Sequence, residues 1–237
     1  MSFNIVYYFQ GQDSEELKYS IRSVEKNLDH DVIYLVGDKP SWFKETNKSV
    51  YIKSGNYNLQ YYGLGSVPIL HLRKLYNSGK MPDEFLLFND DFYIMKRIKD
   101  WTEYYRLEKD YNQKALKNHG YHKKTLRSWQ YTEKKKAYNL HQPMMIEKEK
   151  FVELLKMWEN FQNKDIDFRT LYGNLFTNSK IGCNDCKIGN NYEYSKENLE
   201  KIKNSVFLST SDSSFKEEKI GEIIRSSFDK PSSLEML

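Results

Sequence analysis

Two apolar runs separated by an amphipathic stretch constrain the fold of this chain more than any other feature. Residues 4–9 (NIVYYF) and 31–37 (DVIYLVG) are rich in the residue types that favour buried β-strands. Between them, four apolar residues recur at helical spacing, namely Leu17, Ile21, Val24 and Leu28. Ser14 precedes this stretch as a helix cap. This order of elements, with short connections, predicts two parallel strands with the helix on one face of their sheet.

The rest of the chain repeats the same two kinds of element. Further strands are predicted at residues 50–52, 84–88 and 206–208, and further helices at 69–76, 151–161, 168–176, 196–202 and 217–228. The 237 residues are enough to bury the core of one large domain. We therefore expect an α/β fold with a mostly parallel central sheet flanked by helices.

Composition narrows the classes of ligand. The net charge of +4 is mild, so it permits an anionic ligand without pointing to nucleic acid. Aromatic residues make up 15% of the chain and are mostly tyrosines, whose apolar ring and polar tip suit grooves for sugars and bases. AT-rich codon usage is an equally good explanation of this excess, because it also raises the content of Lys, Asn and Ile.

Neither a membrane segment nor a metal-binding cysteine cluster is expected. No apolar run approaches the length of about 18 residues that a membrane span needs, and residues 1–8 form an apolar strand without the features of a signal peptide. These observations predict a cytoplasmic protein. The two cysteines, Cys183 and Cys186, are too few for a structural zinc site, which normally needs four ligands, so we expect two reduced thiols in a loop.

The strongest local feature is Asn89-Asp90-Asp91, which directly follows the predicted strand at residues 84–88. Two adjacent carboxylates at a packed sheet edge raise each other's pKa unless a cation compensates them. Their hard oxygen ligands suit Mg²⁺ or Mn²⁺ bound to a diphosphate. An ordinary solvated turn is the alternative, because Asn and Asp are also frequent turn residues.

Other candidate residues lie where predicted strands end. Gly11, Gln12 and Asp13 follow the first strand, and Asp38 follows the second. Ligands of such sheets bind at the carboxyl ends of the strands, at a point where the strand order reverses. A solvated turn is the alternative for Gln12 and a helix cap for Asp38. Arg22 could reach a phosphate, or it could be a solvated residue of an amphipathic helix.

Several motifs resemble known families. Asn89-Asp90-Asp91 after an aromatic-rich strand resembles the DxD-type motif of GT-A glycosyltransferases. Residues 16–27 (ELKYSIRSVEKN), 32–38 and 40–43 are similar to the Stealth family of capsular polysaccharide phosphotransferases and related sugar-1-phosphate transferases. Residues 85–94 (FLLFNDDFYI) resemble a later block of that family, and residues 139–143 resemble its His-x-Pro block. The ending at residues 230–235 also resembles phage- and bacteria-borne glycosyltransferases.

The chain departs from the Stealth pattern in two ways. That family has a Trp-Val-Asp-Gly-type turn after its first strand, whereas this chain has Phe9-Gln10-Gly11-Gln12-Asp13. The chain is also short for that family. Both departures weaken the transfer of phosphotransferase chemistry, and they affect the donor site less.

The resemblance implies a GT-A-like fold and a nucleotide-diphospho-sugar donor held with Mn²⁺ or Mg²⁺. Residues 1–110 would form the donor-binding half and residues 111–237 the acceptor-side half of the same domain. Asp91, with Asp90, would hold the metal ion, and Asn89 would orient them or contact the ribose. The nucleotide pocket would be lined by Gly11, Gln12 and Asp13.

Two residues of the second half complete the predicted site. His141 lies before a proline in an apolar stretch, and it could be a metal ligand or the general base for the acceptor. A structural histidine is the alternative. Arg169, with Tyr172 and Asn174, forms a polar patch that could meet the acceptor or a phosphate. Asp212 is predicted to cap the turn before the last helix.

The sequence leaves three functions open. A metal-dependent glycosyltransferase would release the nucleoside diphosphate, and a sugar-1-phosphate transferase would release the nucleoside monophosphate. A nucleic-acid-binding module is the third, because lysine and arginine alternate with aromatic residues between residues 114 and 136. We interpret residues 110–137 as a basic helical lid on the acceptor side. The acceptor itself, a polysaccharide or modified phage DNA, is not identified.

Overall fold

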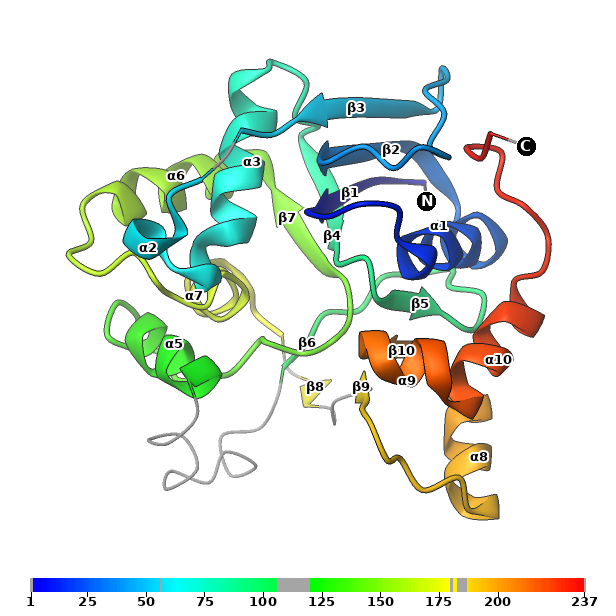
Figure 1. The fold of residues 1–237 in the computed structure, drawn as a ribbon. Coiled ribbons are helices and arrows are strands. Elements are labelled where there is room, and N and C mark those ends of the chain that lie inside the picture. The colour runs from blue at the N-terminus through cyan, green and yellow to red at the C-terminus, as the bar shows by residue number, and fades with distance from the viewer. Residues whose placement is uncertain (1, 56, 106–119, 180, 183–186, 237) are drawn as a thin grey trace.

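A computed structural model describes residues 2–55, 57–105, 120–179, 181–182 and 187–236. Its main feature is a five-stranded sheet in the order β3-β2-β1-β4-β7 (Figure 1). The strands are β1 (Phe3–Phe9), β2 (His30–Gly37), β3 (Ser49–Lys53), β4 (Glu84–Phe88) and β7 (Met144–Glu147). The first four are parallel, and only β7 pairs antiparallel, against β4. The expected mostly parallel α/β sheet is confirmed.

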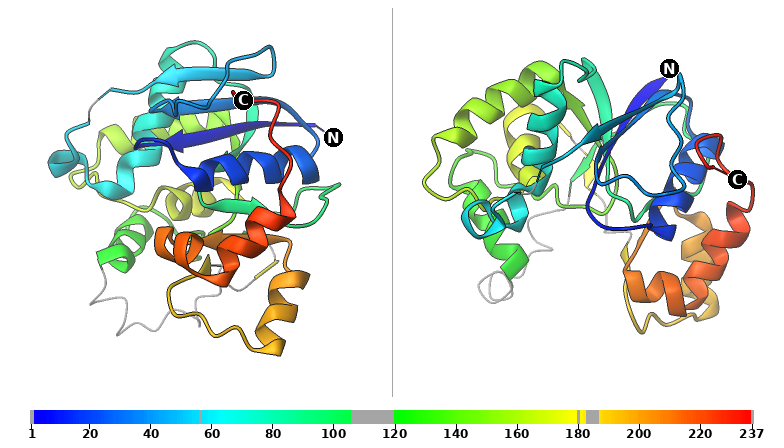
Figure 2. Two further views of the ribbon diagram at one scale, coloured as in Figure 1. Left: turned by 45° about the vertical axis from the view of Figure 1, so that its right-hand side comes forward. Right: turned by 45° about the horizontal axis from the view of Figure 1, so that its top comes forward.

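Side-chain alternation along β1 and β4 gives the sheet two apolar faces. Ile5 and Tyr7 pack on one face with helix α1 (Glu15–Asn27), whereas Val6 packs on the other. That other face is covered by α3 (Val67–Asn77), α6 (Lys148–Glu159) and α7 (Phe168–Phe176), as Figure 2 shows. The sheet is therefore buried between two layers, as the apolar runs of residues 4–9 and 84–88 require.

A second, three-stranded sheet lies beside α1. Its order is β5-β10-β9, formed by Phe92–Ile94, Phe207–Thr210 and Lys187–Ile188. It shares an apolar cluster with α8 (Lys196–Asn204), α9 (Asp212–Glu217) and α10 (Lys219–Ser227). The remaining elements are α2 (Leu59–Tyr62), a short 3-10 turn (Leu64–Ser66), β6 (Tyr104–Tyr105), α5 (Gly120–Trp129) and β8 (Ile181–Gly182).

Gly37 is required at the carboxyl end of β2. Its φ of 138° lies in the region that favours glycine, and a Cβ atom there would meet the carbonyl oxygen of Phe9 at 1.8 Å. This close approach lets the amide of Asp38 donate to the same oxygen at 3.0 Å. The carboxylate of Asp38 in turn accepts from the amide of Gly11 at 2.8 Å. The loops after β1 and β2 are thus joined.

The end of the chain agrees with the prediction in part. The last helix expected at residues 217–228 is confirmed as α10, whereas the short helix α9, which ends just before it, was not predicted. Ser211 caps α9, so the predicted capping role of Asp212 is wrong. The break between the two helices at Glu218 brings Gly221 against the backbone of Phe215, where a Cβ atom would not fit, and so packs one helix on the other.

Strand β7 was not predicted, because its four residues form too short an apolar run to be recognised. Residues 110–119 of the predicted basic lid and the pair Cys183 and Cys186 lie outside the described residues. Within the described part of the chain, no helix is both long enough and apolar enough to cross a membrane.

Candidate active site

The segment Asn89-Asp90-Asp91 lies between two pockets at the carboxyl ends of β1 and β4. These two strands are parallel neighbours in the sheet, although 74 residues of the chain lie between them. Asp90 lines a pocket of about 200 Å³, and Asn89 and Asp91 line a second one of about 420 Å³. The two adjacent carboxylates therefore belong to different pockets.

The smaller one, called the acid-lined pocket below, collects the loop after β1 and the start of α9. Its charged residues are Asp13, Glu15, Glu16, Asp90, Asp212 and Lys216. Burial raises the pKa of Asp90 to about 7, and the nearby Asp91 carboxylate adds to the shift. Burial raises the pKa of Glu16 to about 8, against the opposing hydrogen bond of 2.7 Å that its carboxylate accepts from Thr210. The excess of acids suits hydroxyl groups or a cation better than a bare phosphate.

The larger one, called the basic cavity below, brings together seven segments that are distant in sequence. It is lined by residues that include Tyr8, Asn89, Asp91, Lys124, His141, Arg169 and Lys187. Asn89 accepts two hydrogen bonds at Oδ1, from the Tyr8 hydroxyl at 2.6 Å and from Arg169 at 2.9 Å. Two donors on one oxygen identify that atom as the amide oxygen, so the Nδ2 group of Asn89 is left as a donor.

Arg169 holds two other segments of the basic cavity in place through hydrogen bonds. Asp167 caps helix α7, and its buried carboxylate accepts from Thr170 at 2.7 Å and from Thr125 at 3.1 Å. The cap fixes the first turn of the helix, from which Arg169 extends. The Arg169 guanidinium donates to the carbonyl of Gln142 at 2.8 Å and lies over the ring of Phe92. It therefore fixes both Asn89 and the segment that carries His141.

Asp91 is held by two residues of the second sheet. Its Oδ2 atom accepts from the Lys187 ammonium at 3.0 Å and from the Ser209 hydroxyl at 2.8 Å. Lys187 and Ser209 are paired residues of β9 and β10, so their side chains extend on the same face. Register between these two strands thus decides that a lysine meets Asp91.

Asp165 connects three segments beside the basic cavity, on the side where Gly65 and Lys124 line it. Its carboxylate accepts from the amide of Gly65 at 2.9 Å and from Arg127 at 2.9 Å, and it lies 3.6 Å from the ammonium of Lys124. Gly65 has no room for a Cβ atom, which would meet the carbonyl oxygen of Ile166 at 2.0 Å. The loop before α3, helix α5 and the loop before α7 are therefore held together.

His141 lines the basic cavity. Its ring is 6.4 Å from that of Phe92 in an edge-on arrangement, and the next residue, Gln142, accepts from Arg169. Asn89, Asp91, His141 and Arg169 thus line one cavity. Asp90, Gly11, Gln12 and Asp13 line the other, with Asp38 attached through Gly11.

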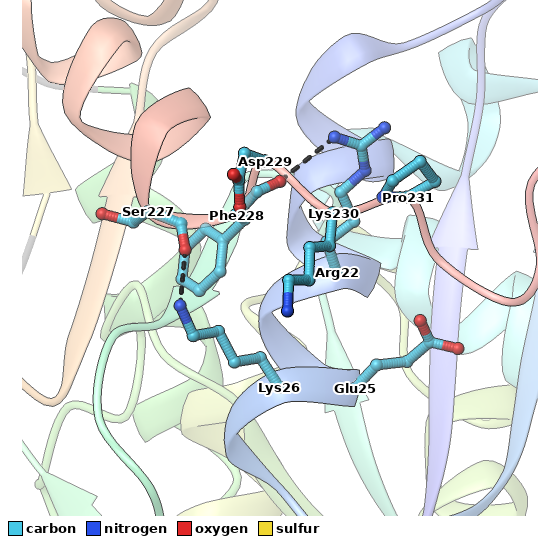
Figure 3. Close-up of a pocket in the computed structure, with 8 residues that line it drawn as sticks. All are labelled: Arg22, Glu25, Lys26, Ser227, Phe228, Asp229, Lys230 and Pro231. Carbon is cyan, nitrogen blue, oxygen red and sulfur yellow. Dashed lines mark hydrogen bonds between the residues drawn. The ribbon is translucent and has the colours of Figure 1, made fainter.

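Arg22 is not brought to either pocket. Its guanidinium binds the carboxylate of Glu235 through two hydrogen bonds of 2.6 and 2.7 Å. It also donates to the carbonyl of Phe228 at 3.1 Å, in a separate hollow of about 300 Å³ where Lys26 donates to Ser227 (Figure 3). The geometry therefore favours a structural role for Arg22, which anchors the last residues to α1.

The other predicted polar residues of α7 are engaged inside the protein. The hydroxyl of Tyr172 accepts from the amide of Glu147 at 2.8 Å, and Asn174 exchanges two hydrogen bonds with the backbone of Lys136. Both side chains are buried. They hold neighbouring segments on α7 and do not face the basic cavity.

The described aromatic residues of the basic segment also pack inward. The indole of Trp129 donates to the carbonyl of Lys136 at 2.9 Å, and the ring of Tyr131 stacks on Phe161 at a centroid distance of 3.6 Å. Tyr138 is buried in the main core. Trp129 and Tyr138 are therefore buried away from any nucleic-acid base, and one face of the Tyr131 ring is covered by Phe161.

The side chains present do not form the predicted Mn²⁺ or Mg²⁺ site. In the part of the chain that the structure describes, no three His, Cys, Asp or Glu residues come together as metal ligands. Asp90 and Asp91 line different pockets, and Asp91 already accepts hydrogen bonds from an ammonium and a hydroxyl. Oxygen ligands of the required kind are present, but their arrangement does not fit a shared ion.

Sequence reasoning missed several residues of these pockets. Lys187 and Ser209 follow Asp91 by 96 and 118 positions and belong to short strands without a motif. Glu16, which is 6% exposed, was not singled out either. The helical spacing of Leu17 and Ile21 gave a partial indication, because Glu16 and Ser20 border the same buried face.

Comparisons with known proteins concern the fold. No family model matches the chain, and no curated protein matches it in sequence. The galactosyltransferase LgtC, crystallised with donor and acceptor sugar analogues, is 10% identical with a TM-score of 0.47, over 97% of this chain and 96% of LgtC. The glycosyltransferase GlyE of Streptococcus pneumoniae TIGR4 is 12% identical with a TM-score of 0.45, over 95% of this chain and 60% of GlyE. These weak similarities identify neither a reaction nor a site residue.

Proposed function

We propose that this protein is a glycosyltransferase that takes its sugar from a nucleotide-diphospho-sugar. One observation carries the proposal. Four polar residues, Asn89, Asp91, His141 and Arg169, line one cavity at the carboxyl ends of the parallel strands β1 and β4. Open α/β sheets generally bind their ligands at the carboxyl ends of the strands. The four residues come from three segments, and all four carry polar groups that can contact a phosphate or a sugar hydroxyl.

The two pockets differ in charge, and this difference assigns the donor to the basic cavity and the acceptor to the acid-lined pocket. The donor diphosphate lies in the basic cavity, where Arg169 and Lys187 provide positive charge and Asn89 provides an amide donor. Hydroxyl groups of the acceptor approach from the acid-lined pocket, where Asp90 has a pKa near that of an effective general base at neutral pH. His141, on the donor side, is the second candidate base.

The transfer then follows the chemistry of the donor. An acceptor hydroxyl oxygen attacks the anomeric carbon, its proton passes to Asp90 or His141, and the bond from that carbon to the diphosphate breaks. The electron pair of this bond leaves with the nucleoside diphosphate. The positive charges of the basic cavity stabilise the departing anion.

Transfer of a sugar-1-phosphate is the second candidate. It is favoured by the three cations that line the basic cavity, Lys124, Arg169 and Lys187, because a transferred phosphate group needs positive charge around it. In this reaction an acceptor hydroxyl oxygen attacks the phosphorus that carries the sugar, and its proton passes to Asp90 or His141. The bond from that phosphorus to the nucleoside monophosphate oxygen breaks, and its electron pair leaves with the monophosphate. Identification of the released nucleotide, diphosphate or monophosphate, separates the two reactions directly.

A thermal-shift screen of nucleoside diphosphates and nucleotide sugars tests the proposal. We expect at least one nucleotide to raise the melting temperature, because a ligand that binds only the folded state stabilises it. The matching nucleotide sugar should release a nucleotide on incubation with acceptor sugars. Absence of any shift, with and without Mn²⁺, would contradict the proposal, and salt-dependent binding of nucleic acid would then be the function to test.

Replacement of Asp90 by asparagine tests its role as a base. We expect nucleotide release to fall by about 100-fold or more, which is the usual contribution of a general base. The melting temperature should not fall, since the substitution removes a buried charge whose pKa is raised. In the wild type, release should increase as the pH rises through about 7, where Asp90 loses its proton.

Asp83→Asn is the matched control. Asp83 is an exposed carboxylate before the opposite, amino end of β4, paired with Lys148 at 2.9 Å. Its removal should leave nucleotide release unchanged. Equal activity of Asp90→Asn and the wild type would transfer the role to His141, and His141→Ala would then have to abolish release.

A further inference from the structure

The basic cavity contains a cation of its own at the position expected for a metal ion. The Lys187 ammonium lies 3.0 Å from Oδ2 of Asp91, and the side chain of Lys187 is 31% exposed, so it borders the open space. Asp91 is less exposed, at 15%. The carboxylate that would have bound a divalent ion is therefore already neutralised by the protein.

The position of Lys187 is built into the fold. Ser209, its partner in β10, binds the same carboxylate oxygen, and Ile188, the next residue of β9, is buried in the core of the second sheet. β10 is itself paired with β5, which directly follows Asp91. These contacts hold the ammonium beside the cavity without any ligand.

The charges of the surroundings favour an anion beside Lys187. Lys124 and Arg169 also line the basic cavity, and its second carboxylate, Asp167, faces away into the hydroxyls of Thr125 and Thr170. A divalent ion on Asp91 would lie within a few ångströms of the ammonium, where the two like charges repel each other. A diphosphate has the opposite sign and would be attracted.

We propose that Lys187 supplies the positive charge that binds the donor diphosphate, so that donor binding requires no divalent cation. This inference rests on the proposed function. It differs from the sequence-based expectation, in which Asp91 would hold Mn²⁺ or Mg²⁺ and the ion would bind the diphosphate. Asp91 acts here as a positioning residue, which orients the Lys187 ammonium through the ion pair.

Calorimetric titration in the presence of EDTA tests the inference. The probes are inorganic pyrophosphate and the nucleoside diphosphate that gives the largest thermal shift in the screen. We expect the wild type to bind both in EDTA. Lys187→Met should bind about 10-fold to 100-fold more weakly, which corresponds to one lost hydrogen bond between charged groups. Lys187→Arg should recover most of the affinity, because it keeps the charge.

Lys148→Met is the matched control, since Lys148 forms an ion pair of 2.9 Å with the exposed Asp83 and lines neither pocket, so its loss should leave the affinity unchanged. Melting curves of each variant show whether it is folded. Binding that requires Mn²⁺ or Mg²⁺, or binding in EDTA that Lys187→Met does not weaken, overturns the inference while the proposed function stands. Failure of every nucleotide to bind in either condition removes both.

Discussion

Replacing Arg169 with methionine is expected to lower the melting temperature by about 6–12 °C. The guanidinium is 6% exposed and donates to three oxygens, the carbonyls of Gln142 and Leu87 and the side chain of Asn89. Each buried acceptor left without a donor costs about 1–3 kcal/mol. A total near 3 kcal/mol corresponds to this shift for a domain of this size, at about 2–4 °C per kcal/mol.

Two further variants separate this role from a loss of charge. Arg169→Lys should recover only a small part of the stability, because one ammonium cannot reach three oxygens in the plane that a guanidinium serves. Arg225→Met removes an arginine that pairs with Glu15 at the surface, and such pairs contribute less than about 1 kcal/mol. Thermal melts of the three variants compare them. A melting temperature of Arg169→Met equal to that of Arg225→Met would show that the buried bridge contributes nothing.

Replacing Glu16 with glutamine is expected to stabilise the protein by about 2 kcal/mol at high pH and to leave it unchanged at low pH. In the folded state Glu16 keeps its proton up to a pH of about 8, whereas an unfolded glutamate loses it near about 4.3. Between these values the folded state binds more protons, so stability falls as pH rises. Protonated Glu16 therefore makes its full contribution to the free energy of unfolding below about pH 4, and this contribution is lost as the pH rises through about 8.

The expected magnitude follows from the shift and its surroundings. Each unit of pKa difference corresponds to about 1.4 kcal/mol, and partial access of solvent to the acid-lined pocket reduces the full value to roughly 2 kcal/mol. Glutamine keeps the acceptor for the Thr210 hydroxyl. Urea denaturation at about pH 5 and about pH 9 measures the difference.

Glu15→Gln is the control in the same turn of α1. Its carboxylate pairs with Arg225, and that hydrogen bond lowers the pKa of Glu15. The sign is therefore opposite, and this variant should lose a little stability at about pH 9 and none below the folded pKa of Glu15. If the free energies of unfolding of Glu16→Gln and the wild type changed with pH in the same way, Glu16 would be charged in the folded state at neutral pH.

Local patterns account for most of the elements and for one part of the site. Strands β1, β2 and β4 were predictable because their apolar residues form continuous runs, and helix α1 because its apolar residues recur at helical spacing. Asn89-Asp90-Asp91 was recognisable for a different reason, because two acids directly after a buried strand are unusual. A parallel strand order then places such residues at a shared sheet edge.

The partners of those residues were decided by the tertiary structure alone. Adjacent Asp90 and Asp91 seemed to form one metal site, yet they line different pockets, and one of them meets Lys187 through the pairing of β9 with β10. Arg22 seemed free to bind a phosphate, yet Glu235 neutralises it. Periodicity records only whether a residue faces the core. Which charge lies opposite another depends on contacts between distant segments, and these carry no local pattern.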